Sequence, residues 1–372
     1  MNYFFALLLS FSLTLFSLRA YCQGCSDGGV CSVGSLSLVQ FKFELLPLVE
    51  NKLTRIITED PGIDTTNSRN GIRINDSTMR TLVYETPVLS NTDTSNTKKT
   101  DFIKYTYQYP KYFFQLSTSY GIGDRRTTII TTQVEGNIRV INKKLFAQIK
   151  IPYTYITGNL GIVHGLGDIT LSATYIAFSK SKSNLSLSGG IKIPTNDADL
   201  TIDNLPLPMV YQTSLGTTDG LIGAKYTLKK WDFTIGYQHS FNANKNKYLY
   251  RSGLKDSVIY NNYFESNMLR RSDDGIFRIN RNFIFKKINA NTGLLFIYHM
   301  KDDLYTNAAG ERQQSKGSEG LTLNLNVAGI IQISKKLDFV FIYASPLITR
   351  KSRPDGLTRK FVVQVGFKYN IF

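Results

Sequence analysis

The sequence predicts an all-β fold: a transmembrane antiparallel up-and-down β-barrel of about twelve strands, with short periplasmic turns and long extracellular loops. Two observations predict it. From residue 112 onwards, segments of about 9 to 13 residues alternate apolar and polar side chains with a period of two, as strands with one buried face do. The connections between these segments alternate between short and long, which is typical of outer-membrane barrels. A soluble sandwich has no reason to sort its loops in this way.

The chain begins with a segment that predicts a secretory signal peptide over residues 1–22. Residues 4–18 are continuously apolar or hydroxylic but too short to span a membrane, and Ala20 and Cys22 are suitable small residues before a cleavage at Gln23. No Lys or Arg precedes this segment, so an uncleaved anchor is the alternative. Export combined with a barrel predicts the outer membrane of a Gram-negative bacterium.

Cleavage would leave Cys25 and Cys31 as the only cysteines of the mature chain. In an oxidising compartment we expect these two to form a disulfide. Two thiols without a neighbouring histidine make a poor zinc site, so no metal is expected. Because the closed loop is so short, the stabilising effect of the disulfide should be local.

Residues 23–111 differ in character from the rest of the chain. Residues 35–49 and 102–108 could form strands, whereas 87–100 is polar and indicates a loop or linker. Two extra strands would make a barrel of fourteen. Alternatively, the segment enters the lumen as a plug or lies in the periplasm, and the sequence leaves these possibilities open.

The barrel itself is expected over residues 112–372, with an even number of strands. They are predicted near residues 112–122, 127–140, 145–156, 169–178, 185–194, 220–228, 231–241, 275–285, 288–300, 320–332, 337–346 and 359–371. Every short connection between them contains lysine, as in the Lys229–Lys230 pair. The long connections are rich in Asn, Asp, Ser and Gly.

Aromatic residues gather near the predicted strand ends, among them Trp231, Phe285 and Tyr369. Such a distribution is expected of girdles at the two membrane interfaces, although aromatics also favour strands in general. Arg281 is an exception, because it is in phase with the apolar set that should face lipid. We expect either a bulge that turns it inward or a position near the periplasmic headgroups.

Three strings carry a family resemblance: GLGDITLSATYIAF at 165–178, GGIKIPTND at 189–197 and SLGTTDGLIGAKYTL at 214–228. They resemble, in order and spacing, successive motifs of the outer-membrane transporter family of the meta-pathway phenol-degradation type. Residues 23–36 also resemble the mature start of Bacteroidetes-type outer-membrane proteins. The resemblance implies a barrel that passes hydrophobic compounds across the outer membrane.

The chain ends in Phe372, and outer-membrane barrels usually end in an aromatic residue that the barrel-insertion machinery recognises. We therefore expect that machinery as a partner. Tyr369 lies three residues before the end, where such barrels commonly have an aromatic two residues before it. Either a bulge restores the register or the signal is read loosely.

If the apolar set faces lipid, the other set lines the lumen. The predicted lining is polar and net basic, and consists of Arg139, Lys150, Lys192, Lys225, Arg278 and Lys368 against Glu135, Asp232 and Asp338, with Gln133, Gln148 and Gln364 among the neutral residues. Basic rings favour anions in a pore. The alternative is that these charges pair with carboxylates or with a plug and conduct nothing.

Two functions follow as hypotheses. The first is a channel or transporter for a small polar, anionic or aromatic solute, and the alternative is a structural or accessory outer-membrane protein with a plugged lumen and partner-binding loops. No enzyme activity and no cofactor are expected, because His239 and Ser240 are adjacent in a strand and point to opposite faces. Nucleic acid is disfavoured as a partner, since the basic residues are dispersed.

Lipid and lipopolysaccharide are the expected surface partners. Six basic loop residues are predicted to meet lipopolysaccharide phosphates: Arg270, Arg271, Arg350, Lys351, Arg353 and Arg359. Asp168 follows a glycine and Asp219 precedes one, and each lies next to the start of a predicted strand. We interpret them as turn-forming residues, with Ca²⁺ binding or loop-holding ion pairs as alternatives.

Overall fold

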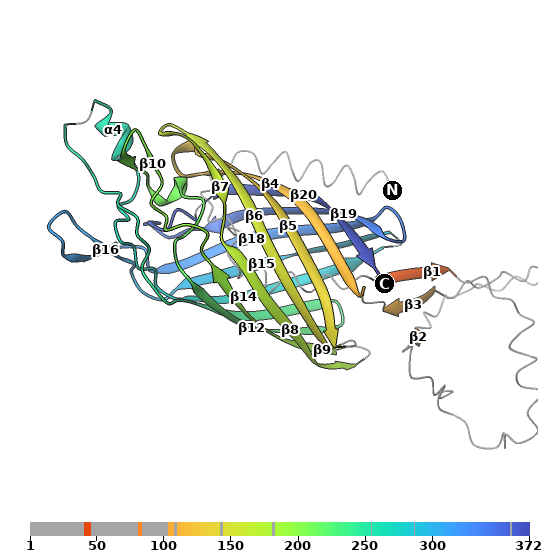
Figure 1. Cartoon of the computed structure of the whole chain (residues 1–372). Helices are drawn as coiled ribbons and strands as arrows, with labels where there is room; N and C mark the ends of the chain where they lie inside the picture. Colours follow the sequence, from red (N-terminus) through yellow and green to blue (C-terminus); the bar gives the residue numbers. More distant parts are fainter. Residues whose placement is uncertain are drawn as a thin grey trace, which may run out of the picture. The chain divides into compact units, whose positions relative to one another are not determined.

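The structure is a computed structural model that describes residues 110–372, except 142–143, 181–182, 254, 286 and 358, together with the backbone of three short strands nearer the N-terminus (Figure 1). The predicted signal peptide and the pair Cys25 and Cys31 lie outside the described residues. The short strands are β1 (Phe41–Leu45), β2 (Thr81–Val83) and β3 (Ile103–Tyr107), which form a separate antiparallel sheet in the order β1-β3-β2. Because β1 and β3 pair with each other in this sheet, the alternative of a fourteen-stranded barrel is wrong.

Twelve strands form one closed antiparallel barrel, as the alternation predicts. They are β4 (Tyr112–Gly123), β5 (Thr128–Ile141), β6 (Leu145–Gly158), β8 (Ile169–Lys180), β9 (Ser183–Ile193), β12 (Asp219–Leu228), β13 (Trp231–Ser240), β14 (Asp274–Ile284), β15 (Ile288–His299), β18 (Gly320–Gln332), β19 (Leu337–Ile348) and β20 (Arg359–Ile371). Each predicted strand is confirmed.

Neighbouring strands of the barrel are consecutive in the chain, and the last strand closes the sheet on the first. In the β20–β4 register, Phe367 lies opposite Leu116. One short strand is extra: β7 (Gly161–Leu166) pairs with the second half of β6, while β8 pairs with its first half. Closure leaves no open edge, which a sheet in lipid requires because the hydrocarbon offers no other hydrogen-bond partner.

Short turns and the C-terminus lie at one end of the barrel, and the long loops at the other (Figure 1). The connections at the long-loop end contain the remaining elements. The short β4–β5 connection contains η2 (Asp124–Arg126), and the long loops contain β10 (Thr201–Ile202), β11 (Leu205–Pro206), η3 (Met209–Tyr211), α4 (Ser257–Tyr260), β16 (Leu304–Thr306) and β17 (Arg312–Gln314). No helix in the described part of the chain is long and apolar enough to cross a membrane.

Side chains alternate between an apolar outer face and a largely polar inner face. On β5, Thr131, Gln133 and Glu135 point inward and are buried. On β20, Val365 and Phe367 point outward with 42% and 53% of their surface exposed. A continuous exposed band of large apolar residues is unfavourable in water and suits contact with lipid.

Arg281 lies on the outer face of β14 in a regular stretch, because its pairing with Thr292 continues without a register shift. The predicted bulge is therefore wrong. Arg281 instead lies opposite Trp231, the first residue of β13 after a short turn, and its guanidinium is 5.1 Å from the Trp231 ring and 5.8 Å from the Phe283 ring. The arginine thus sits among the aromatic residues at the short-turn end, as the other alternative proposes.

The C-terminal strand has no bulge near Tyr369. Its pairs with β4 run on continuously to Ile371 and Tyr112, and its register shift lies at the other end, between Arg359 and Val362. The suggested correction of the register at Tyr369 is therefore wrong. Recognition of Phe372 during insertion stays a prediction.

Candidate functional site

The long loops fold inward and pack against the inner wall of the barrel. Leu207, Val210 and Tyr211 of the loop at 194–218 contact Ile129 and Ile156, which point inward from β5 and β6. None of the five is more than 5% exposed. The long-loop end of the barrel therefore has a hydrophobic core of its own.

The following long loop, 241–273, joins the same core. Tyr248, Tyr260 and Tyr263 pack into it. Fully buried Asn246 connects the two loops, because its side-chain amide donates to the backbone oxygens of Ala198 at 2.7 Å and Leu207 at 3.0 Å. Such buried side-chain to backbone bonds give an irregular loop one fixed conformation.

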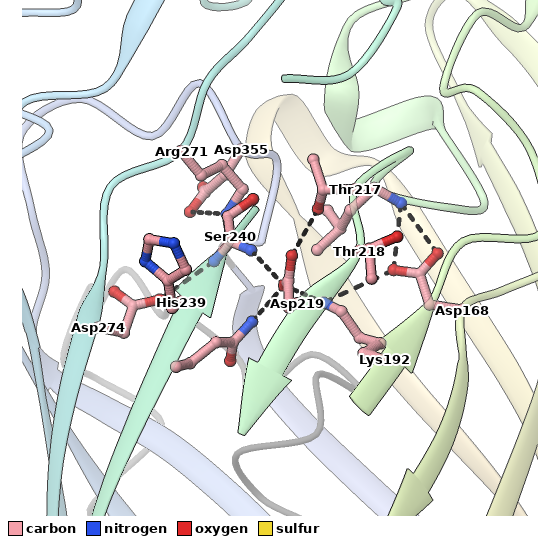
Figure 2. A network of polar contacts seen from close by, with 12 residues as sticks. Asp168, Lys192, Thr217, Thr218, Asp219, His239, Ser240, Arg271, Asp274 and Asp355 are labelled. Atoms are coloured by element: carbon pink, nitrogen blue, oxygen red, sulfur yellow. Dashed lines mark hydrogen bonds and ion pairs between the residues drawn. The ribbon is translucent and has the colours of Figure 1, made fainter. Parts of the chain in front are cut away.

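A network of buried charges connects the long loops to strands of the barrel (Figure 2). Lys192 on β9 has its Nζ 3.0 Å from Asp219 Oδ2 and 3.6 Å from Asp168 Oδ2. Asp168, just before β8, accepts hydrogen bonds from Ser214 Oγ at 2.5 Å and from the Leu215 backbone N–H at 3.2 Å. Asp168 thereby ties the loop at 194–218 to the wall.

Arg271 lies within 4.0 Å of three carboxylates of the cluster (Figure 2). Its Nη1 donates to Asp219 and its Nη2 to Asp274, both at 3.1 Å, and its Nε lies 4.0 Å from Asp355. Asp219 and Asp274 are the first residues of β12 and β14. One planar guanidinium therefore joins the loop at 241–273 to two strands, a geometry that lysine cannot reproduce.

His299, the last residue of β15, bridges two carboxylates. Its Nδ1 lies 2.7 Å from Asp274 Oδ1 and its Nε2 lies 2.8 Å from Asp303 Oδ1. An ionised carboxylate only accepts hydrogen bonds. If both aspartates are ionised, both ring nitrogens must carry hydrogens and the imidazole is a cation.

The loop at 349–358 is held by Arg350 and Asp355. Arg350 Nη2 donates to Asp355 Oδ2 at 2.7 Å, and its Nη1 donates to the backbone oxygen of Ser318 at 2.8 Å. Burial acts to raise the pKa of Asp355, but Arg350 and Arg271 outweigh it and hold that pKa below its usual range. At neutral pH the pair is therefore fully charged.

The carboxyl of Asp168 behaves in the opposite way. Burial raises its pKa above the usual value, and Lys192 and Ser214 only partly oppose this. Removal from water thus outweighs the attraction to cations in setting the pKa of Asp168, whereas at Asp355 the combined attraction of the cations outweighs removal from water.

We call this cluster the loop lock. It consists of Asp168, Lys192, Asp219, Arg271, Asp274, His299, Asp303, Arg350 and Asp355, and each of these residues is at most 9% exposed. The lock ties four loops to strands β9, β12, β14 and β15. A buried ion-pair network of this kind adds little net stability but is sensitive to the loss of any one partner.

A cavity of about 70 Å³ lies between the lock and the packed loops. Asp168, Lys192 and Ser214 contribute polar lining, and Ile156 and Met209 contribute apolar lining. This volume exceeds the roughly 10 to 15 Å³ that a single water needs, so the space is large enough for water. It offers a small solute both polar and apolar contacts inside the barrel.

Farther from the long loops, most of the predicted lumen residues make polar contacts inside the barrel. Lys150 Nζ lies 3.5 Å from Glu135 Oε2, and Gln148 also donates to Glu135. Lys225 Nζ lies 3.2 Å from Asp232 Oδ2. Together with Lys192, at least three of the six basic residues predicted for the lumen are therefore paired with carboxylates of the described residues.

The other predicted residues also occupy inward positions. Arg139 and Arg278 are half-buried on β5 and β14. Buried Lys368 has its Nζ 4.2 Å from the Phe113 ring, and Gln364 donates to Ser117 Oγ at 2.8 Å. The Gln133 amide reaches Glu135 at 3.5 Å.

Several predicted surface residues prove to be buried. Arg271, Arg350 and Arg359 are 4%, 5% and 7% exposed, so the prediction that they meet lipopolysaccharide is wrong. Arg270 and Lys351 are exposed as predicted. Half-buried Arg353 donates to Asp124 at 3.0 Å.

Asp168 and Asp219 hold loops through ion pairs, so the preferred interpretation as turn-forming residues is wrong and one of the alternatives is right. The sequence analysis missed His299, Asp274 and Asp303. A usable signal was present, because Asp219, Asp274 and His299 are charged or titratable residues at the long-loop ends of strands.

In the described part of the chain, the three histidines form no hydrogen bond with a serine hydroxyl. His239 Nδ1 lies 2.7 Å from Asp273, and Ser240 on the opposite face donates to the backbone oxygen of Asn242. His164 lies 2.7 Å from the Tyr153 hydroxyl. No group of three or more metal-ligating side chains was found among the described residues.

Comparison with known proteins gives only distant likenesses. No family model matches the chain, and no curated protein matches it. An outer-membrane channel from Pseudomonas putida F1 superimposes with a TM-score of 0.48 and 12% identity, over 70% of this chain and 96% of that chain. The porin NanC gives a TM-score of 0.42 and 8% identity, over 69% of this chain and 100% of that chain. Outer membrane phospholipase A from Escherichia coli gives a TM-score of 0.36 and 9% identity, over 71% of this chain and 94% of that chain.

Likenesses this distant say nothing about what this chain passes or binds. They include an enzyme as well as channels, so they do not decide between these classes. The resemblance to the meta-pathway family stays a prediction.

Proposed function

We propose that this chain is an outer-membrane channel for small polar solutes, with a long-loop end that is closed by its own inward-folded loops. One observation carries the proposal: a closed sheet with an apolar exterior and a polar interior encloses loops that are held by a buried charge cluster. The exterior suits lipid, and the interior suits water and polar solutes. Passage then requires the loops to move.

The solute class follows from the lining. Paired carboxylates offset the charges of Lys150, Lys192 and Lys225, which argues for only a weak preference for anions. The polar inner wall argues for polar solutes over bare hydrocarbons. The cavity beside the lock, about 70 Å³, is about half the size of one that admits benzene, roughly 150 Å³, so an aromatic solute would also require the loops to move.

An accessory role is the second candidate, because loops that never leave the lumen would make the barrel a plugged scaffold. The inward packing of Tyr211 against Ile129 and Ile156 supports this alternative. The two candidates differ in one property, which is whether the loops open.

Single-channel recording in planar bilayers tests the proposal, with Arg350→Gln as the variant. The substitution leaves Asp355 buried without its nearest cation, a loss that typically costs about 3 to 5 kcal/mol. We expect the open probability to rise at least about tenfold above that of the wild type. Lys351→Gln is the matched control, since it removes the same charge from the exposed neighbouring residue.

Stable openings that Arg350→Gln increases and Lys351→Gln does not would support the channel. Silence of the wild type and of Arg350→Gln, in protein whose circular dichroism shows the folded barrel, would contradict it and favour the accessory role.

A further inference from the structure

The positive charge of the chain is distributed unevenly between the two ends of the barrel. The connections at the long-loop end, residues 124–127, 167–168, 194–218, 241–273, 300–319 and 349–358, contain fourteen Lys and Arg against thirteen Asp and Glu, so they are nearly neutral. The short-turn end has eleven lysines and no Asp or Glu in its turns. They are Lys111, Lys143, Lys144, Lys180, Lys182, Lys229, Lys230, Lys286, Lys287, Lys335 and Lys336. Much of the formal charge of +16 is therefore at one end.

We call these eleven residues the lysine ring. All eight whose side chains the structure describes are exposed. None of the eight forms an ion pair with a carboxylate of the described residues, in contrast to the buried cations at the long-loop end. The ring thus has charge available for an external partner.

The ring lies directly beyond an aromatic belt. Tyr112, Phe178, Trp231 and Phe285 are exposed on the outer face beside these turns, with exposed fractions between 36% and 48%. Lys111 Nζ is 5.1 Å from the Tyr112 ring. Exposed aromatics of a barrel lie at the boundary between hydrocarbon and headgroups, so lysines one or two residues farther out lie at the level of the lipid phosphates.

We propose that the lysine ring binds the headgroups of anionic phospholipids in the leaflet around the short-turn end. The inference rests on the proposed membrane location but not on conductance. Lysine serves as a point charge for phosphate, and clustered basic residues at a membrane surface recruit anionic lipids. Arg281, stacked over Trp231 on the lipid-facing side, adds a further cation at this level.

The chain contains its own probe, because Trp231 is its only tryptophan and follows Lys229 and Lys230 directly. The full-length protein is reconstituted in phosphatidylcholine bilayers that contain a small fraction of either brominated phosphatidylglycerol or brominated phosphatidylcholine. Bromine quenches Trp231 only in lipids that contact it. We expect local enrichment of phosphatidylglycerol by about two- to fivefold in low salt, and its loss at 1 M salt.

Lys229→Asn with Lys230→Gln removes the two lysines next to the probe. Asparagine is chosen at 229 because the backbone there has φ 54°, a conformation that asparagine tolerates. We expect the enrichment to fall to near one. The matched control is Lys301→Gln with Lys316→Gln, which removes two exposed lysines from a long loop and should leave the enrichment unchanged.

Equal quenching by the two brominated lipids in low salt would overturn the proposal and leave the ring as a surface for an acidic protein or polymer. Enrichment of phosphatidylglycerol that persists in the Lys229→Asn, Lys230→Gln variant would also overturn the proposal. A silent barrel that still shows the enrichment would contradict the proposed channel and leave the lipid site standing, so the two failures are distinguishable.

Discussion

Gly356 is a residue whose position depends on the lack of a side chain. It adopts φ +68°, and a Cβ there would meet the backbone of Met209 and Val210 in the facing loop. The loops at 194–218 and 349–358 can approach this closely only because residue 356 is glycine. Steric contact and the loop lock therefore act on the same pair of loops.

We predict that Gly356→Ala loosens this contact. A left-handed alanine costs about 1 kcal/mol in its own backbone, and the clash with Met209 and Val210 adds to that cost. Proteolysis of the detergent-solubilised protein should cut the loop at 349–358 several-fold faster than in the wild type. Gly310→Ala is the control, because Gly310 has φ +83° but nothing within 4 Å of the added atom. Equal cleavage in both variants would show that the close approach has no role.

Asp355 gives the lock a defined dependence on pH. Because its folded pKa lies below the ordinary value of 3.8, its stabilising contribution is complete above that value and is lost as the pH falls through the folded pKa. The contribution of Asp168 to stability changes with pH in the opposite direction. Burial raises its pKa, so protonation of this carboxyl removes the free-energy cost of a buried charge. Acid should therefore release the loop at 349–358 while leaving the Asp168 contact closed.

We expect conductance to stay constant from pH 7 to about pH 4 and to rise only below that range, as Asp355 begins to bind protons. Asp355→Asn should be open at pH 7 and respond less to acid, because the titrating group is absent. Recordings at stepwise lower pH test this. An opening transition already complete at pH 5 would assign the acid response to another group.

At the scale of whole elements, the strands could be predicted and the loop packing could not. Each strand of the barrel carries its own signal, since an apolar exterior and polar interior impose a period of two on residues such as those of β5 and β20. The contacts of the loop lock join residues far apart in the chain, for example Asp219 with Arg271, and no local pattern encodes them. Buried Arg350 and exposed Lys351 are adjacent and both basic, so composition alone cannot tell them apart.

Inside the barrel, too, the direction of a side chain could be predicted from the sequence, whereas its partner could not. Alternation puts Glu135, Lys150 and Lys225 in the inward set, and the side chains of all three are at most 11% exposed, but their pairing depends on the register between strands. A shift by one residue would turn every side chain of a strand to the opposite face. The near neutrality of the paired groups is thus a property of the assembled sheet.

Gly293 gives a prediction for the central strands. On β15, an added Cβ would collide with the backbone oxygen of Ile279 and with Asn280 on β14. We expect Gly293→Ala to force these strands apart and to lower the yield of folded barrel in refolding, measured by the heat-sensitive shift in gel migration. Gly329→Ala on neighbouring β18 is the control, because its added atom would lie 3.9 Å from its nearest neighbour. Normal refolding of Gly293→Ala would show that the strands can separate there at little cost.

At the scale of the whole molecule, the barrel is complete within residues 112–371. Its closure uses β20 and β4, and none of its pairings involves β1, β2 or β3. Residues 39–109 form a compact unit of their own. We therefore predict that a chain lacking residues 23–109, with residues 1–22 retained, still folds into a barrel that resists heat in detergent like the full-length protein.

This deletion also distinguishes the remaining possibilities for the N-terminal segment. If the segment occupies the lumen, its removal should raise single-channel conductance, whereas a periplasmic segment should leave conductance unchanged. In both cases Arg350→Gln should still increase opening, because the lock lies wholly within residues 168–355. Failure of the shortened chain to reach the heat-resistant form would show that residues 23–109 are needed for folding, and the domain boundary proposed here would then be wrong.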